Sequence, residues 1–189
     1  MSKENLSRIL TLRSLRNGDA IDVFNSFANL CIFNGSLPLV KPIDVYGAEQ
    51  FIKHVNFQPT KGLPSRTVFG VTENGRVVGV VGLYNIAIDQ SAELSFWMMR
   101  KKCPPDLYDR LIINPVISIV RKVVRLAFNL YNVEDLISIV LVRNYNARDI
   151  LVENGFIMNK VISPNYKIGE TNEEFSVAKI DSHSIKRRI

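Results

Sequence analysis

One stretch, residues 67–99, constrains the fold more than any other part of the chain, because it holds the densest β-strand signal. Within it, Asn74-Gly75 is the dipeptide most typical of a tight β-hairpin turn. We expect a strand on each side of this turn, the second over residues 77–84, and a third strand over 92–99 after a turn at 89–91. Three consecutive antiparallel strands form a meander, which flanking helices can cover.

Composition favours one domain. The chain has 189 residues, 47% of them hydrophobic, which is enough for one well-filled core and too little for two comfortable domains. We expect a single domain over residues 1–180 and a polar, basic tail over 181–189. The net charge of +6 favours acidic partners such as coenzyme phosphates. A dedicated nucleic-acid binder would more often show a basic stripe with interleaved aromatic residues, so nucleic-acid binding is not expected.

Cysteine usage and hydropathy bound the location of the protein. Cys31 and Cys103 are too few for a metal or disulfide framework, and free thiols are typical of a reducing cytoplasm, although one bridge stays open. His54 and His183 have no partners at metal-ligand or triad spacing, so no metal site is predicted. No apolar run approaches the roughly 20 residues of a membrane helix, and residues 1–10 lack the apolar core of a signal peptide. We therefore expect a cytoplasmic protein without a membrane partner.

The elements before the meander follow from periodicity and capping signals. A first strand is predicted over residues 9–15. Apolar spacing predicts a helix over 20–32, with Asp19 as its N-cap. A second helix is predicted over 45–57, with Asp44 as its N-cap.

The elements after the meander are read in the same way. Asn114 and Pro115 are typical of the N-cap and first turn of a long helix. The apolar run over residues 136–142 predicts a strand buried on both faces. Asn144 then opens a short helix over 147–153.

Strands predicted over residues 156–162 and 175–180 close the chain. The resulting order is β-α-α-β-β-β-α-β-α-β-β. This order predicts an α/β single domain with a mixed, mostly antiparallel sheet of about seven strands and four helices.

Three segments match the motifs of one known family. Residues 12–20 are similar to its opening LRPL…DA, residues 78–97 to IG…GL…AELGYWL, and residues 144–156 to N…S…L…GF. On these residues the chain resembles the GNAT acetyltransferase superfamily, and within it the branch that acetylates the N-termini of ribosomal proteins. The resemblance implies a GNAT-like fold, acetyl-CoA as cosubstrate, and a primary amine as acceptor, such as a protein N-terminus.

The pyrophosphate-binding motif of that family is degenerate here. The family pattern is R/Q-x-x-G-x-G/A, and this chain keeps Arg110 but has Ile113 and Pro115 at the two small-residue positions. A β-branched Ile tolerates a positive φ poorly, so the usual loop geometry would be strained. The resemblance still assigns the coenzyme phosphates to Arg110 and to the start of the following helix, at Asn114 and Val116.

The resemblance also implies how the reaction would be catalysed. Glu93 matches a family position that takes the proton of the incoming amine, directly or through water. A structural ion pair on a strand face is the alternative role for this residue. Leu151 lies where the family often has a tyrosine that protonates the departing thiolate, and Tyr145 is the nearby substitute, with simple packing as its alternative.

Further coenzyme contacts are implied near the end of the third meander strand. The resemblance assigns the pantetheine arm to main-chain groups of Trp97, Met98 and Met99, with the Trp97 side chain expected in the core. Asn144 matches a family asparagine that contacts the same arm, and it also suits an N-cap. Ala147 replaces a serine that is common at this coenzyme-contacting position.

Two functions follow from these residues. The first is an acetyl-CoA-dependent N-acetyltransferase in which the amine of a protein, peptide or small molecule attacks directly. The alternative is a catalytically inactive GNAT-fold protein that serves as a binding or structural module, because the departures from the family pattern cluster where the chemistry would be. Coenzyme A species and an amine acceptor are the expected partners, and the oligomeric state is left open, a homodimer included.

Overall fold

The computed structural model describes residues 9–28, 30–34, 42–57, 64–99, 108–162 and 175–186. The elements in chain order are β1 (Thr11–Arg13), η1 (Asn17–Asp19), α1 (Ala20–Ala28), β2 (Leu30–Asn34), α2 (Val45–Asn56), β3 (Thr67–Glu73), β4 (Arg76–Ala87), β5 (Ser91–Met99), η3 (Asp109–Ile113), α3 (Asn114–Leu130), β6 (Asp135–Leu141), α4 (Tyr145–Glu153), β7 (Ile157–Ile162), β8 (Phe175–Asp181) and α5 (Ser182–Lys186).

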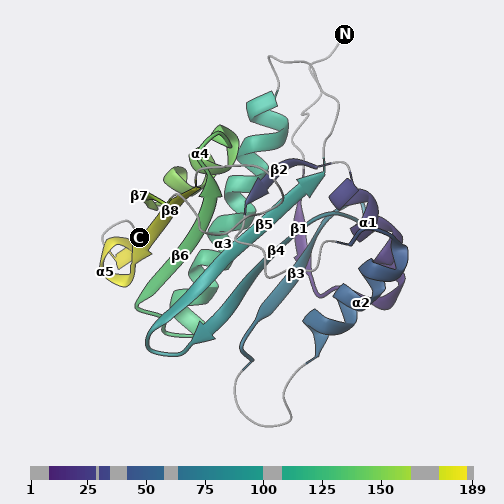
Figure 1. Cartoon of the computed structure of the whole chain (residues 1–189), viewed down its shortest axis with the longest axis horizontal. Helices are drawn as coiled ribbons and strands as arrows, with labels where there is room; N and C mark the ends of the chain where they lie inside the picture. The colour runs from purple at the N-terminus through teal and green to yellow at the C-terminus, as the bar shows by residue number, and fades with distance from the viewer. Residues whose placement is uncertain are drawn as a thin grey trace.

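One mixed sheet runs through the molecule (Figure 1). Its strands follow the order β1-β3-β4-β5-β6-β8-β7, and β2 pairs with β5 beside this path. Among the strands that the structure describes, β5 and β6 are the one parallel pair, and the other pairs are antiparallel. The predicted fold class is confirmed, with β2 as an additional strand.

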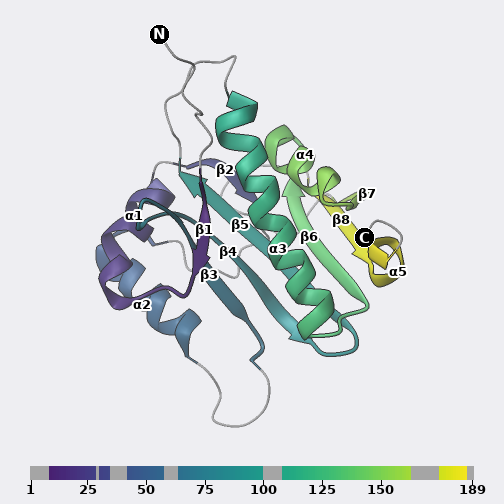
Figure 2. The same cartoon turned by 180° about the vertical axis from the view of Figure 1, so that it is seen from behind.

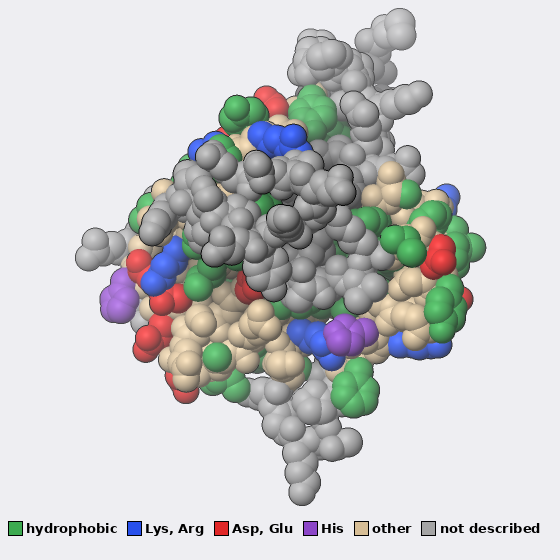
Figure 3. All heavy atoms as spheres, in the orientation of Figure 1, with side chains coloured by type: hydrophobic (Ala, Val, Ile, Leu, Met, Phe, Trp, Pro, Cys, Tyr) green, Lys and Arg blue, Asp and Glu red, His purple; other side chains and the backbone are tan. Residues whose placement is uncertain are grey.

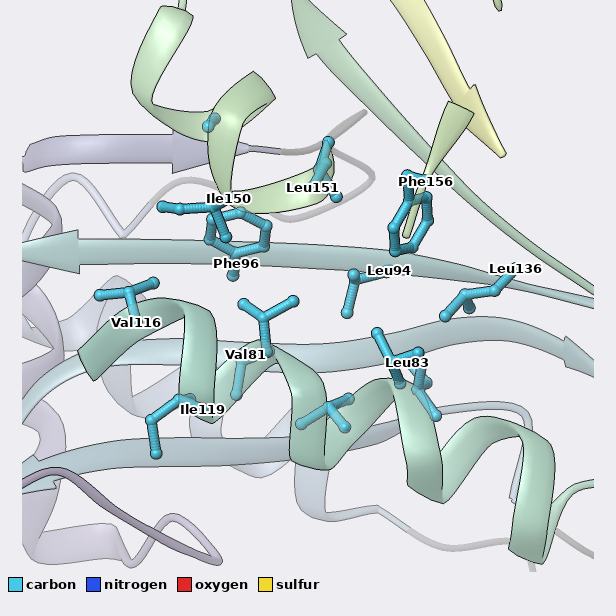
Figure 4. Close-up of a cluster of buried hydrophobic side chains, with 14 of the residues drawn as sticks. Val81, Leu83, Leu94, Phe96, Val116, Ile119, Leu136, Ile150, Leu151 and Phe156 are labelled. Atoms are coloured by element: carbon cyan, nitrogen blue, oxygen red, sulfur yellow. The ribbon is translucent and has the colours of Figure 1, made fainter. Parts of the chain in front are cut away.

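Helices cover both faces of the sheet. Figure 2 shows α3 lying across one face, and α4 packs against the same cluster of buried side chains. On the opposite face, α1 and α2 cover a second cluster that contains Trp97. Figure 4 shows the first cluster, in which side chains of β4, β5 and β6 meet those of α3 and α4. The sheet is therefore the middle of three layers.

The meander is confirmed, and its first turn follows from local backbone chemistry. Asn74 and Gly75 both have positive φ angles, 51° and 82°, as a tight hairpin turn of the I′ type requires. The strand β4 continues to Ala87, beyond the predicted end at residue 84. Along β5, Leu94, Phe96 and Met98 enter the first cluster and Trp97 enters the second, because successive side chains of a strand point to opposite faces.

The helix predicted over residues 20–32 is wrong in its second half. The helix α1 ends at Ala28, and Leu30–Asn34 form β2 instead. Apolar residues at 31 and 32 fit a helical spacing, but this short apolar segment is also suited to a strand, and β5 offers it an open edge. The expected N-cap is wrong as well, because the Asp19 carboxylate accepts hydrogen bonds from the Arg13 guanidinium and the Arg16 amide.

The long helix begins earlier than the sequence predicts. Tyr108 is already helical, and the π-helical turn η3 leads directly into α3. The Asn114 amide donates to the Asp109 carbonyl, so Asn114 lies inside the helix and is not its N-cap. A proline ring lacks an N–H and clashes with the carbonyl four residues earlier, so Pro115 explains why the preceding turn is widened.

Two further expectations, the burial of the strand over residues 136–142 and the form of the tail, are corrected. The strand β6 alternates buried with half-buried side chains, so it is not fully buried on both faces. The predicted tail contains a short helix, α5, directly after β8.

The predicted N-caps Asp44 and Asn144 are confirmed, because each side chain accepts a hydrogen bond from the backbone N–H three residues later.

Candidate active site

The strand β5 has different neighbours along one of its edges. Its first residues pair with β6, in register from Ser91 to Glu93. From Phe96 to Met99 the strand pairs with β2 instead. The other edge pairs with β4 over most of its length. Glu93 is therefore the last β5 residue paired with β6, at a fork where the two parallel strands separate.

Glu93 is a half-buried carboxylate at this fork. Its side chain is half-buried on the face of the sheet that α1 and α2 cover, and its Oε2 accepts a hydrogen bond from Asn85 Nδ2 at 3.3 Å. Its Oε1 is buried and has no hydrogen-bond partner among the described residues. Burial raises the pKa of Glu93 above its usual value, and the bond from Asn85 lowers it in part. A carboxylate with an open oxygen and a raised pKa is suited to accept a proton.

Asn85 reaches Glu93 through an irregularity in β4. The register between β4 and β5 shifts between Tyr84 and Ala87, and Asn85 has a positive φ of 50°. Such a bulge re-aims a side chain, and Asn is one of the few residues that adopts this backbone region readily. Sequence reasoning missed Asn85, although an asparagine within a β-rich run is a signal for such a bulge.

Three polar side chains lie in a row on this face, and we call Arg66, Tyr84 and Glu93 the polar row. Tyr84 is the direct cross-strand partner of Glu93. Arg66 directly precedes Thr67, whose partner on β4 is Leu83, so continuing this register places Arg66 beside Tyr84. Sequence reasoning identified only Glu93, because Arg66 and Tyr84 come beside it only once the strand register is known.

The other two members of the polar row also have unpartnered atoms. Tyr84 is only 5% exposed, and its hydroxyl has no partner among the described residues. Burial is the main cause that raises the pKa of Tyr84; the charge of Arg66 opposes this shift and that of Glu93 adds to it. Arg66 Nη1 contacts His54 Nε2 at 2.5 Å, while Arg66 Nε is buried and has no hydrogen-bond partner within the described part of the chain. The last turn of α2 therefore reaches the row through His54.

The predicted pantetheine contacts lie on the part of β5 that pairs with β2. Leu30 is the partner of Met99, Ile32 of Met98, and residue 33 of Trp97. The Trp97 side chain is in the core as expected, 1% exposed, and its Nε1 donates to Ser26 Oγ at 3.1 Å.

The other predicted coenzyme contacts lie on α3 and α4. The Asn114 backbone N–H donates a hydrogen bond to the Asp109 backbone carbonyl, and Val116 is buried. The Arg110 side chain lies outside the described parts of the structure. The Asn144 side-chain oxygen accepts a hydrogen bond from the Ala147 backbone N–H at 3.3 Å, and Ala147 is fully buried.

The family resemblance assigns coenzyme A to main-chain groups near the end of β5 and at the start of the long helix. In this arrangement β2 takes the β5 edge, and the Asn114 amide already has an acceptor inside the helix. A coenzyme bound along this part of β5 would therefore have to displace β2, and the Asn114 amide is already used within the helix. Tyr145, the predicted proton donor, is the first residue of α4 and is 69% exposed.

A cavity of about 450 Å³ lies at the opposite end of β5 from Glu93. It is lined by residues of α1 and of the β3–β4 hairpin together with Met99. The Asp22 carboxylate on its wall is bound by the Arg76 guanidinium and the Val77 amide. This cavity is separate from the polar row.

Two general features of the described residues bear on partners. No group of three or more His, Cys, Asp and Glu side chains among them could hold a metal ion, and no helix among them could cross a membrane. On the face shown in Figure 3, acidic and basic side chains are interspersed.

Solved structures share this fold. A point mutant of the spermidine N-acetyltransferase SpeG from Vibrio cholerae aligns with a TM-score of 0.70 and 20% identity, covering 95% of this chain and 98% of the other. A dodecameric structure of the spermidine N-acetyltransferase from Vibrio cholerae gives a TM-score of 0.67 and 20% identity, covering 95% and 97%. At this identity the likeness concerns the fold. A sequence search of curated proteins found no match.

A sequence model of one protein family spans most of the chain. The family is described as the acetyltransferase (GNAT) domain, and the match covers residues 13–174. The matched residues include the polar row, the fork at Glu93 and the helices α3 and α4. With this match and the shared architecture, the chain belongs to the GNAT acetyltransferase domain family.

Proposed function

We propose that this protein transfers an acetyl group to a primary amine, with Glu93 as the general base. The family implies acetyl-CoA as the donor of the acetyl group. The observation that carries the proposal is the Glu93 carboxylate at the fork between β5 and β6, with one oxygen open and a raised pKa.

The role of Glu93 follows from the protonation state of the acceptor. A primary amine is an ammonium ion at neutral pH and must lose a proton before its nitrogen can attack. Glu93 Oε1 takes that proton, and burial makes the carboxylate a stronger base than an exposed glutamate. Asn85 fixes the orientation of the carboxylate through its bond to Oε2. Tyr145, at the start of α4, stays the proposed donor of the proton that the departing thiolate takes up.

Glu93→Gln tests this role. The substitution keeps the shape of the side chain and removes its basicity, so the acetylation rate should fall by about 10²–10⁴. Glu153→Gln is the matched control, since Glu153 is an exposed residue at the end of α4. The wild type and Glu93→Gln should unfold at the same urea concentration, which shows that the variant is folded. Equal acetylation rates for these two proteins across a panel of amines would contradict the proposal.

The acceptor and the assembly are finer parts of the same proposal. A protein N-terminus, a peptide and a small amine all remain acceptors to be tested, the ribosomal-protein branch included. Acetylation of a set of peptides and small amines, followed by mass spectrometry, ranks them directly. Light scattering of the purified protein distinguishes a monomer from a homodimer or a larger assembly.

A second function is favoured by one specific observation, the pairing of β2 with β5. In this alternative the protein keeps the fold, does not use coenzyme A, and acts as a binding or structural module. Thermal unfolding with acetyl-CoA, CoA and ATP separates the two functions. A ligand at about 100 times its Kd stabilises the folded state by roughly 2.7 kcal/mol, which is easily measured. A shift with both coenzyme A species and none with ATP would exclude this alternative.

A further inference from the structure

Three unpartnered polar atoms are concentrated in the polar row. Five buried side-chain nitrogen or oxygen atoms in the described structure have no hydrogen-bond partner, and three of them are Arg66 Nε, the Tyr84 hydroxyl and Glu93 Oε1. Buried polar groups in folded proteins are bonded in the great majority of cases. Three such atoms in one row on one sheet face therefore point to a partner that is not part of the described chain.

The charges along the row indicate what kind of partner fits. Glu93 at one end is a carboxylate and suits an ammonium group. Arg66 at the other end is a guanidinium, and no carboxylate among the described residues pairs with it. Arginine is always a donor, so His54 Nε2 accepts the bond from Arg66 and the imidazole is neutral. The positive charge of Arg66 is thus available to an anionic group.

The spacing of the strands limits the size of the partner. Neighbouring strands lie about 4.8 Å apart, so the backbones at Arg66 and Glu93 are separated by roughly 10 Å, with Tyr84 between them. The long side chains of Arg66 and Glu93 shorten the gap that a ligand has to span. A small molecule with a few bonds between its two charged ends matches this gap, and the Tyr84 hydroxyl can donate to the anionic end.

We propose that the polar row is the acceptor site and selects a small primary amine that also carries a carboxylate. The ammonium group lies against Glu93 Oε1, and the carboxylate accepts hydrogen bonds from Arg66 Nε and the Tyr84 hydroxyl. This assignment rests on the proposed acetyl transfer for the fate of the amine, but recognition of the ligand does not depend on it. A polyamine fits the row poorly, because its second ammonium group would face the Arg66 guanidinium.

The test compares matched pairs of ligands. Glycine, β-alanine and 4-aminobutyrate each carry a carboxylate, and ethylamine, propylamine and butylamine have a methyl group in its place. For the amino acid of best length, kcat/KM should exceed that of its methyl partner at least about tenfold, and spermidine should be a poor acceptor. Calorimetric titration with the same six compounds measures binding independently of acetyl transfer.

Two variants connect this preference to the row. Arg66→Gln and Tyr84→Phe should each raise KM for the amino acid far more than for its methyl partner, with a smaller change in kcat. Arg66→Lys, which keeps the charge, should restore part of the preference. Arg121→Gln is the matched control, because Arg121 is exposed on α3 and should leave the preference unchanged.

Each outcome separates this inference from the proposed function. Equal use of the paired ligands, better use of spermidine, or a preference that survives both variants would overturn the inference. If a buried water and not a ligand bridges the three atoms, both variants would leave the ligand preference unchanged. Acetyl transfer that depends on Glu93 would then still stand. Carboxylate-dependent binding that Arg66→Gln abolishes, without acetylation of any amine, would support the recognition site and reject the proposed function.

Discussion

Tyr84→Phe is expected to stabilise the ligand-free protein, although it removes a polar group from a candidate site. The hydroxyl of Tyr84 is buried and has no partner among the described residues, so folding removes it from water without compensation. Leaving a buried hydroxyl unsatisfied costs about 1–3 kcal/mol. Phenylalanine keeps the ring and leaves no cavity, so the free energy of unfolding should rise by about this amount. For a chain of this size, each 1 kcal/mol raises Tm by about 2–4 °C.

Tyr131→Phe provides the matched control with the opposite sign. Tyr131 is buried to a similar extent, 4% exposed, but its hydroxyl is hydrogen-bonded to Thr67 Oγ1. Removing that hydroxyl deletes a bond and leaves the threonine oxygen without it, so stability should fall by about 1 kcal/mol. Urea unfolding followed by fluorescence measures both variants, because Trp97 is the single tryptophan and is fully buried.

The comparison of the two variants is decisive only at constant m-value. An unchanged m-value shows that the midpoint shift reports stability and not a change in the surface exposed on unfolding. A loss of stability in Tyr84→Phe as large as in Tyr131→Phe would refute the reasoning, because it would mean that the Tyr84 hydroxyl has a bonding partner in the free protein.

Three more predictions concern the packing around the site. Ser26→Ala should destabilise the protein by about 1–3 kcal/mol in urea unfolding, because it leaves the buried Trp97 Nε1 without its acceptor. Gly79→Ala should cost about 1–3 kcal/mol or more by the same assay, since a Cβ would overlap the Trp97 carbonyl, which belongs to the sheet; an unchanged midpoint would show that the sheet yields there. Burial, followed by the charge of Arg66, lowers the pKa of His54 below 6.5, so the unfolded chain takes up this proton first. Stability should therefore decline as pH falls below about 6.5, and a His54→Gln variant should lose less stability over this range than wild type.

Local signals in the sequence were sufficient for most of the elements. Asn74-Gly75 fixed the hairpin because the backbone requirement of its turn involves only those two residues. Asp44 and Asn144 were found as N-caps for the same reason, since each bonds an amide three residues away.

The features that sequence reasoning missed depend on distant partners. Residues 30–34 form a strand because β5 has an open edge beyond Glu93, and no pattern within the segment reveals that edge. The polar row brings Arg66, just before β3, and Tyr84 on β4 beside Glu93 on β5, so predicting it requires the strand register. Asn114-Pro115 was misread because a Pro-containing start and a π-helical turn within a longer helix share the same local sequence.

The pairing of β2 with β5 has a consequence for any ligand that would bind along the same edge. Such a ligand and β2 compete for one set of main-chain hydrogen bonds, so the ligand binds only molecules in which β2 is detached. Its apparent Kd equals the intrinsic Kd divided by the detached fraction, so a fraction of about 1% weakens binding about 100-fold. Sequence changes in β2 would then tune affinity without touching the ligand, and this strand would set the concentration at which the protein responds.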